Sequence, residues 1–202
     1  MMHLALLFLG AYVLGAIPVG VLVARAHGVD LFKFGSGNVG ATNVARAVGR
    51  PWGIAVFILD ALKGFSPALI AHWISPHVEV WFAAGLAAVI GHCASPFLRF
   101  KGGKGVSTAL GMVAGSLPLV AAGGFLVWCI VFALTRYVSL SSIIGTFVGL
   151  VLCATLPGRS WYVLGAFTLL FLFVVYTHRA NIRRLREGTE PKFEFRNQPQ
   201  HE

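Results

Sequence analysis

The chain has 202 residues, of which 57% are hydrophobic and only 11% are charged. Soluble domains carry about 25% charged residues, so this composition excludes an ordinary water-soluble globular protein. The formal net charge is +9, which suits an anionic lipid surface or anionic substrates. The charges lie in short segments between apolar runs, so no soluble basic domain is available to bind nucleic acid. We therefore expect an integral membrane protein.

Six apolar runs follow one another along the chain, and the long ones reach the roughly 20 residues needed to cross a bilayer core. The first run is too long for a signal-peptide core and lacks a basic start, so we expect it to be retained. The fourth run has 29 residues, and as one helix it would extend about 43 Å, beyond a core of about 30 Å. Gly115, Ser116 and Pro118 predict a break in it. The runs are 4–24, 52–74, 79–98, 107–135, 137–156 and 161–177.

The positive charges predict how these runs are oriented. Of the 16 Lys and Arg residues, 14 lie in the segments 25–50 and 99–106, at Arg136, or after residue 178. The positive-inside rule places all four sites in the cytoplasm. Run 107–135 then joins two cytoplasmic sites and must cross an even number of times. We expect one all-α domain, 1–202, of seven transmembrane helices, with the N-terminus outside, the C-terminus cytoplasmic, and a short or re-entrant helix near 107–116.

The first polar motif, residues 35–46, follows the first apolar run. Its glycines let the backbone bend and approach a ligand closely, and Arg46 can bind phosphate through two parallel hydrogen bonds. A membrane-surface loop whose Ser and Asn cap a helix is the alternative, but the density of polar groups before an arginine favours a ligand site. The candidate binding residues are Gly35, Ser36, Gly37, Asn38, Thr42, Asn43 and Arg46.

The second motif, residues 101–108, is rich in glycine and lysine. A glycine-rich backbone can form a nest of amides for an anion, and the helix that follows offers its N-terminus to phosphate. It is not a P-loop, because Gly105 follows Lys104 and Leu98 occupies the first glycine position. A basic loop that obeys the positive-inside rule would explain the lysines but not the glycines. The candidates are Lys101, Gly102, Gly103, Lys104, Gly105, Ser107 and Thr108.

The third motif, residues 178–190, begins at the end of the last apolar run. If that span continues as a helix, His178 and Asn181 share one face and can reach a site, while the neighbouring arginines meet anionic headgroups. A stop-transfer tail explains the arginines equally well. A histidine and an asparagine at the membrane edge favour function.

Two sets of polar residues within the apolar runs receive structural interpretations. Asp60 and Lys63 lie three residues apart within the second run, and an unpaired charge there would be costly, so we expect them to pair and to support the nearby loops. His92 is interpreted as a packing histidine. The three cysteines lie in apolar runs, and no pair has metal-ligand spacing, so we expect neither a disulfide nor a metal site.

Together, the three motifs place phosphate-binding parts beside a His/Asn pair where acyl chains meet headgroups. At these residues, Gly35 to Arg46, Lys101 to Thr108 and His178 to Glu190, the sequence resembles the bacterial membrane acyl-phosphate:glycerol-3-phosphate acyltransferases. The resemblance extends over essentially the whole chain. It implies transfer of a fatty acyl group from acyl phosphate to the 1-hydroxyl of glycerol 3-phosphate, giving lysophosphatidic acid, in the first acylation step of phospholipid biosynthesis. It also implies that neither acyl-CoA nor acyl carrier protein is the direct donor.

The resemblance assigns roles to the motifs. Ser36, Lys104, His178 and Asn181 are the expected catalytic residues, and the other motif residues bind substrate. Ser142, or its neighbour Ser141, is a further expected phosphate contact. Alignment of hydroxyl and carbonyl and stabilisation of the oxyanion require no cofactor, metal or covalent intermediate. The proton acceptor is either His178, with an ordinary pKa near 6.5, or a donor phosphate oxygen, with a second pKa of about 6; we favour the phosphate.

We expect the protein in the bacterial cytoplasmic (inner) membrane, in contact with membrane lipid, with its active site at the cytoplasmic face. Functional coupling to an enzyme that forms acyl phosphate is a further expectation. The competing class is a transporter of an organic phosphate, since glycine-broken helices and basic groups would suit one. Its binding site would lie near the midplane between paired repeats, whereas here the polar groups gather at one face and no repeat is visible.

Overall fold

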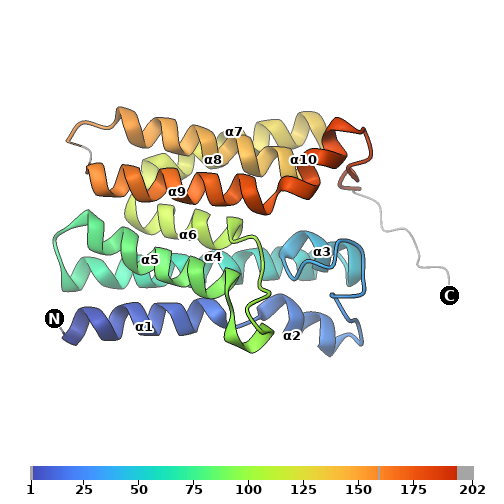
Figure 1. Cartoon of the computed structure of the whole chain (residues 1–202), viewed down its shortest axis with the longest axis horizontal. Helices are drawn as coiled ribbons and strands as arrows, with labels where there is room; N and C mark the ends of the chain where they lie inside the picture. Colours follow the sequence, from blue (N-terminus) through green and yellow to red (C-terminus); the bar gives the residue numbers. More distant parts are fainter. Residues whose placement is uncertain (1, 159, 195–202) are drawn as a thin grey trace.

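The computed structural model describes residues 2–158 and 160–194, and these form an all-helical bundle in two layers (Figure 1). Arg159 and Arg196, both included in the charge count above, lie outside the described residues. The first layer contains α1 (Met2–Ala16), α2 (Val19–Ala26), α3 (Ala41–Ala47), α4 (Arg50–Ile74), α5 (Val78–Cys93), the 3-10 turn η1 (Pro96–Leu98) and α6 (Val106–Ser116). The second layer contains α7 (Pro118–Thr135), α8 (Val138–Thr155), α9 (Trp161–Thr177) and α10 (Arg179–Arg186).

Helix length and hydropathy make the chain an integral membrane protein. Among the described residues, five helical segments are long and apolar enough to cross a membrane, and α9 with α10 makes a sixth if that bent pair counts as one span. The sequence-predicted break in run 107–135 is confirmed, because α6 ends at Ser116 and α7 begins at Pro118. The 11 residues of α6 extend only about 16 Å, about half of a bilayer core.

Two further breaks were not expected. The last span does not continue straight into the third motif, because α9 and α10 meet at a 56° bend at His178. The first span is broken between α1 and α2, where Pro18 cannot donate a backbone hydrogen bond. The carbonyls freed there find side-chain donors: Ser95 Oγ lies 2.6 Å from Ala16 O, and Lys63 Nζ lies 2.5 Å from Ile17 O. Asp60 and Lys63 pair as expected, at 2.7 Å.

Close helix packing in the first layer depends on glycine. A Cβ on Gly64 would overlap the Thr108 carbonyl of α6, and a Cβ on Gly111 would overlap the Ala61 carbonyl of α4. The backbones of α4 and α6 therefore approach directly, which holds the short α6 in the bundle. This packing also buries Thr108 completely, and its Oγ1 has no hydrogen-bond partner among the described residues.

The two layers meet along a crevice between α6 on one side and α7, α8 and α9 on the other. Phe82 of α5 packs against Phe167 of α9, with ring centroids 5.9 Å apart. The crevice contains an apolar slot of about 540 Å³, a volume that includes its open side. Phe57 of α4 and Phe125 of α7, which is 39% exposed, line it toward the outside of the bundle.

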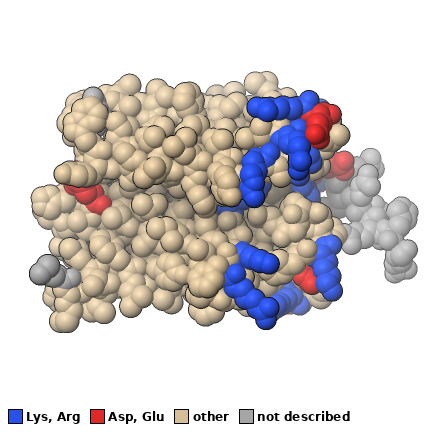
Figure 2. Space-filling view, viewed as in Figure 1, with Lys and Arg blue, Asp and Glu red and all other residues tan. Residues whose placement is uncertain are grey.

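The charged residues are concentrated at one end of the bundle. On the face shown in Figure 2, Lys and Arg gather at the end where Figure 1 places α2, α3 and α10. We call this the basic end. It contains the loop 27–40, the loop 94–105, the turn at Arg136 and the segment after His178, which include all three polar motifs.

Candidate active site

The first motif folds around Asn43, which lies in the first turn of α3, two residues after Ala41. The side chain of Asn43 is 2% exposed, and all its polar atoms bond within the motif's own loop. Its Oδ1 accepts from the Ser36 amide at 3.3 Å, and its Nδ2 donates to the carbonyls of Phe34, at 3.0 Å, and Leu31, at 3.4 Å. Gly35 and Gly37 have positive φ values of 56° and 67°, which suits glycine. Asn43 thus shapes the loop that presents Ser36, and Thr42 lies next to it in the first turn of α3.

The second motif is a loop folded back on the end of α5. The amides of Gly102 and Gly103 donate to the carbonyls of Cys93, at 3.0 Å, and His92, at 3.1 Å. Gly105, with φ of 78°, then forms the N-cap of α6 and offers no side-chain cap. The first amides of α6 therefore remain available for an anion. Lys101 is exposed and Ser107 half-buried, both beside this helix start.

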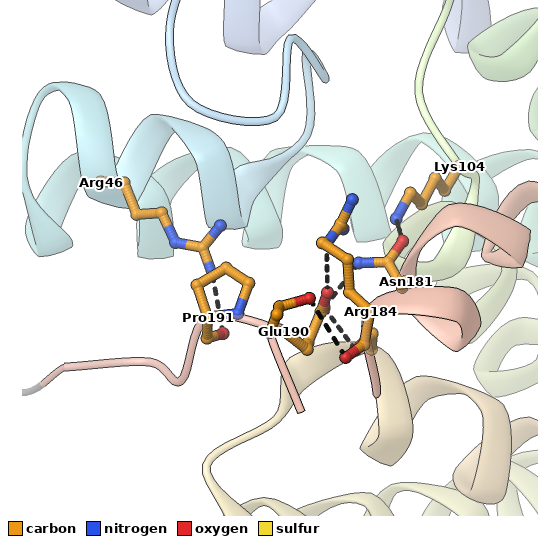
Figure 3. Close-up of polar contacts among 8 residues, drawn as sticks. Arg46, Lys104, Asn181, Arg184, Glu190 and Pro191 are labelled. Atoms are coloured by element: carbon orange, nitrogen blue, oxygen red, sulfur yellow. Dashed lines mark hydrogen bonds and ion pairs between the residues drawn. The ribbon is translucent and has the colours of Figure 1, made fainter. Parts of the chain in front are cut away.

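Residues from the three motifs meet in one hydrogen-bonded cluster at the basic end (Figure 3). Lys104 Nζ donates to Asn181 Oδ1 at 2.5 Å, and Asn181 Nδ2 donates to Glu190 Oε1 at 2.6 Å. Glu190 also accepts from Arg184 Nε, at 2.7 Å, and from Ser139 Oγ, at 2.7 Å. Arg46 Nη2 reaches the same segment by donating to the carbonyl of Pro191 at 3.3 Å. Three cationic side chains thus surround one carboxylate.

Burial and neighbouring charges change the pKa values of these groups. Burial lowers the pKa of Lys104 to about 8, against the attraction of Glu190 and together with repulsion from Arg184 and Arg46. Burial also lowers the pKa of Arg46, with Glu190 opposing the change. Burial raises the pKa of Glu190, but hydrogen bonds from Asn181, Ser139 and Arg184 outweigh it, so the net pKa is lowered. Glu190 is therefore an anion that holds the cations in place.

His178 lies just after α9 and is 3% exposed. Its Nδ1 is 2.8 Å from the Val174 carbonyl, which can only accept, so Nδ1 carries the proton and Nε2 is the free acceptor. Burial, followed by repulsion from Lys104, lowers the pKa of His178 to about 4. The imidazole is therefore neutral near pH 7.

The apolar slot begins beside this cluster. Ser142, which lines the slot from α8, accepts from Trp128 Nε1 at 3.3 Å and donates to the Val138 carbonyl at 2.7 Å. Val106 of α6, only two residues after Lys104, lines it from the other layer. From Ser142 the slot extends along α8 to Gly149, with Val120 and Phe167 at its deep end.

The structure sorts the sequence-predicted residues into three groups. Arg46, Lys104 and Asn181 meet in the cluster. His178 lies close enough for the charge of Lys104 to lower its pKa. Asn43 and Thr108 are buried in the framework instead. Ser142 lies in the slot, and Thr42 and Ser107 lie in the first turns of α3 and α6. The remaining predicted residues lie on the loops around the cluster: Gly35, Ser36, Gly37, Asn38, Lys101, Gly102, Gly103 and Gly105.

Sequence reasoning missed Ser139, Arg184 and Glu190 as site residues. Glu190 lies at the end of the third motif and is one of only seven acidic residues in the chain. Because this carboxylate follows several arginines in the sequence, the charge pattern could have predicted that Glu190 forms an ion pair. Ser139 carried no such signal, because its role arises only from the approach of a segment 51 residues away.

The chain is similar to known membrane enzymes over nearly its whole length. The family model of glycerol-3-phosphate acyltransferases matches residues 5–188. The glycerol-3-phosphate acyltransferase of Geobacter sulfurreducens is 48% identical over 184 residues, covering 91% of this chain and 94% of that protein. The Aquifex aeolicus protein of the same description is also 48% identical, over 185 residues, covering 91% and 95%.

Solved structures agree with the sequence comparison. A crystal structure of PlsY, an integral membrane glycerol 3-phosphate acyltransferase in its glycerol 3-phosphate form, superposes with a TM-score of 0.90 at 45% identity, covering 95% of this chain and 96% of that one. Its lysophosphatidic acid form gives 0.87 at the same identity and coverage. The fold and site thus define a multi-pass membrane acyltransferase. The chain belongs to the glycerol-3-phosphate acyltransferase family.

Proposed function

We propose that this acyltransferase moves a fatty acyl group from acyl phosphate to the 1-hydroxyl of glycerol 3-phosphate, giving lysophosphatidic acid and phosphate. One observation carries the proposal: a cationic cluster lies at the mouth of an apolar slot, and both are built from the same two layers. Lys104 lies two residues before the slot-lining Val106. A phosphate held at the cluster and an acyl chain held in the slot would meet at this junction.

The phosphate of glycerol 3-phosphate binds Lys104, Arg46 and the free amides at the start of α6. Charge-assisted hydrogen bonds of this kind are the strong ones, and a helix N-terminus adds to them. Asn181 and Glu190 hold Lys104 in position before the substrate arrives, which reduces the entropy lost on binding. Lys101, Gly102, Gly103, Gly105, Ser107 and Thr108 form the rest of this loop and helix start, with Gly103 and Thr108 buried in its framework.

The acyl donor lies with its phosphate near the first motif and its chain in the slot. Ser36, Asn38 and Thr42 contact the donor phosphate, while Asn43 and the glycines Gly35 and Gly37 set the shape of their loop. Ser142 lies between the two regions. The slot is lined toward the lipid by Phe57 and Phe125, so the chain enters sideways from the bilayer.

Acyl phosphate is a mixed anhydride, and phosphate is a good leaving group. The hydroxyl oxygen attacks the acyl carbon, the new C–O ester bond forms, and the C–O bond to phosphate breaks with its electron pair. The hydroxyl proton passes to a donor phosphate oxygen, whose second pKa is about 6 in comparable esters. The neutral His178 orients the hydroxyl through Nε2, and Asn181 and Lys104 complete the alignment. Ser36 contributes to stabilising the oxyanion.

The concentration of Lys and Arg at one end supports a single orientation in the membrane (Figure 2). With α1–α2 as one broken span and α6 as a short one, the spans number seven: α1–α2, α4, α5, α6, α7, α8 and α9. The positive-inside rule then places the N-terminus outside and the basic end, with the active site, in the cytoplasm. The bacterial relatives support a location in the cytoplasmic (inner) membrane for this single-domain chain, and functional coupling to an enzyme that forms acyl phosphate follows from the donor.

The test uses purified protein in detergent or lipid mesophase, with palmitoyl phosphate and glycerol 3-phosphate, and measures both phosphate release and lysophosphatidic acid. We expect equal amounts of both products without added metal, and no product when palmitoyl-CoA or palmitoyl-acyl carrier protein replaces the donor. Product from either thioester at a comparable rate would refute the donor assignment. Family membership already decides against the organic-phosphate transporter that the sequence left open.

A further inference from the structure

A buried ionic group in the first layer has no part in the mechanism above. Asp60 and Lys63 are 2% and 5% exposed, and His92 Nδ1 lies 3.7 Å from Asp60 Oδ1. Charges buried within membrane helices are expensive even when paired, and an apolar pair often serves stability equally well. Because stability alone does not explain this ionic group, its role is inferred from the residues that it contacts.

Lys63 fixes the break in the first span. Its Nζ donates both to Asp60 and to the Ile17 carbonyl at the break, which also accepts from the Val19 amide at 3.0 Å. Ser95, 1% exposed, donates to the adjacent Ala16 carbonyl. Ser95 is the second residue of the 94–105 loop, and its own carbonyl accepts from the Phe100 amide at 2.8 Å. The ion pair and the start of this loop are thus tied to two adjacent carbonyls, Ile17 and Ala16 respectively.

His92 supports the other end of that loop. The Gly103 amide donates to the His92 carbonyl at 3.1 Å, and a Cβ on Gly103 would overlap His92 Nε2. One edge of the imidazole thus faces Asp60 while Nε2 contacts Gly103, directly before Lys104. A small cavity lined by Ile17, Asp60, His92 and Ser95 lies between these parts.

We propose that Asp60, Lys63 and His92 are positioning residues that set where the 101–105 loop lies. The imidazole forms the surface on which Gly103 rests, and the Asp60–Lys63 pair fixes that imidazole and the broken first span together. This position determines where Lys104 and the first amides of α6 meet a phosphate. The inference rests on the proposed assignment of the glycerol 3-phosphate phosphate to Lys104.

The experiment compares His92→Gln with His72→Gln. His72 also lies in the first layer and hydrogen-bonds a carbonyl, that of Gly115 at 2.9 Å, but far from the loop. A shifted loop weakens phosphate binding equally in the ground and transition states, so KM rises while kcat is retained. We expect His92→Gln to raise KM for glycerol 3-phosphate about tenfold or more, with kcat and KM for palmitoyl phosphate within about twofold. His72→Gln leaves all three within about twofold.

A second readout needs no turnover. Glycerol 3-phosphate raises the Tm of the wild-type protein by binding the folded state, and we expect a smaller rise for His92→Gln at the same concentration. Unchanged KM and unchanged Tm rise in folded His92→Gln would overturn the inference. So would a fall in apparent kcat with both KM values unchanged, because a loss of folded enzyme has that pattern. If wild-type protein makes no product from palmitoyl phosphate, the proposed donor fails and the Tm comparison still decides this inference.

A double-mutant cycle isolates the contact itself and serves if His92→Gln does not fold. Gly103→Ala pushes the loop away from the imidazole, so it should raise KM for glycerol 3-phosphate selectively. In a His92→Ala background the obstructing ring is absent, and the same substitution should add less than about a twofold change. Additive effects of the two substitutions would show that His92 does not position Gly103.

Discussion

Filling the deep end of the apolar slot should shorten the acyl chains that the enzyme accepts. A Cβ on Gly149 would lie 3.2 Å from Phe167 Cζ and 3.8 Å from Val120 Cγ1, so the side chain of Gly149→Leu would enter the slot there. Ser142 and Gly149 are seven residues apart on α8, which is about 10 Å along the helix. Long chains reach this level and short chains do not.

The size of the effect follows from packing. A fatty chain arrives from lipid, which is as apolar as the slot, so hydrophobic transfer contributes little. Forcing extra methylenes into a filled core costs about 1–3 kcal/mol, which corresponds to about 5- to 150-fold in binding. The ratio of kcat/KM for palmitoyl phosphate to that for octanoyl phosphate should therefore fall by this factor in Gly149→Leu.

A matched control is available on the lipid-facing side. Gly165 of α9 is exposed, and a Cβ added to it would have no described atom within 4 Å, so Gly165→Leu changes the same residue type outside the slot. The assay measures kcat/KM in detergent for saturated acyl phosphates of increasing length. Gly165→Leu should leave the ratio within about twofold. An unchanged ratio in folded Gly149→Leu would refute the placement of the acyl chain in this slot.

Three further predictions concern the polar cluster. The cation of Lys104 disappears as pH rises through about 8, so kcat/KM for glycerol 3-phosphate should fall above that pH, while Lys104→Arg stays flat to pH 9.5 or so; parallel profiles would contradict the role of Lys104. Glu190→Ala should lower the free energy of unfolding by about 3 kcal/mol, because three donors lose a buried acceptor. The pKa of Glu190 is lowered in the folded state, so its stabilisation is complete above its ordinary value and fades as pH falls through the folded value; denaturant titrations of wild type and Glu190→Gln should converge in acid. His178→Gln should keep kcat within about tenfold, since loss of a general base usually costs 10²- to 10⁴-fold, and a larger loss in single-turnover assays would make His178 the base.

Local rules were sufficient for the apolar helices and the polar motifs, while the count of seven spans stays a prediction beside the five or six candidate spans among the described residues. Apolar length predicted the helices, and charge parity together with Pro118 predicted the break between α6 and α7, which the structure contains. The Asp60–Lys63 pair was also predictable, because residues three apart on a helix are neighbours and an isolated charge in a membrane helix is costly. These features depend only on the chain's own sequence near each residue.

The arrangement of the site depended on contacts between distant segments. Lys104 and Asn181 are separated by 77 residues, and Arg46 and Pro191 by 145. Glu190 became the centre of the cluster only because the chain turns back after the 56° bend at His178. Asn43 and Thr108 have the same side-chain chemistry as ligand-binding residues, yet packing buried both.

Sequence alone thus determined that this is a helical membrane protein with three polar motifs of acyltransferase type. Periodicity, charge and hydropathy are patterns over neighbouring residues, so the sequence alone is enough to predict the helices and the motifs. Tertiary structure alone decided which motif residues meet in the polar cluster, which ones hold the loops, and that the slot begins beside Lys104. Those outcomes depend on how the two layers meet, where burial and hydrogen-bond geometry are set by residues from both.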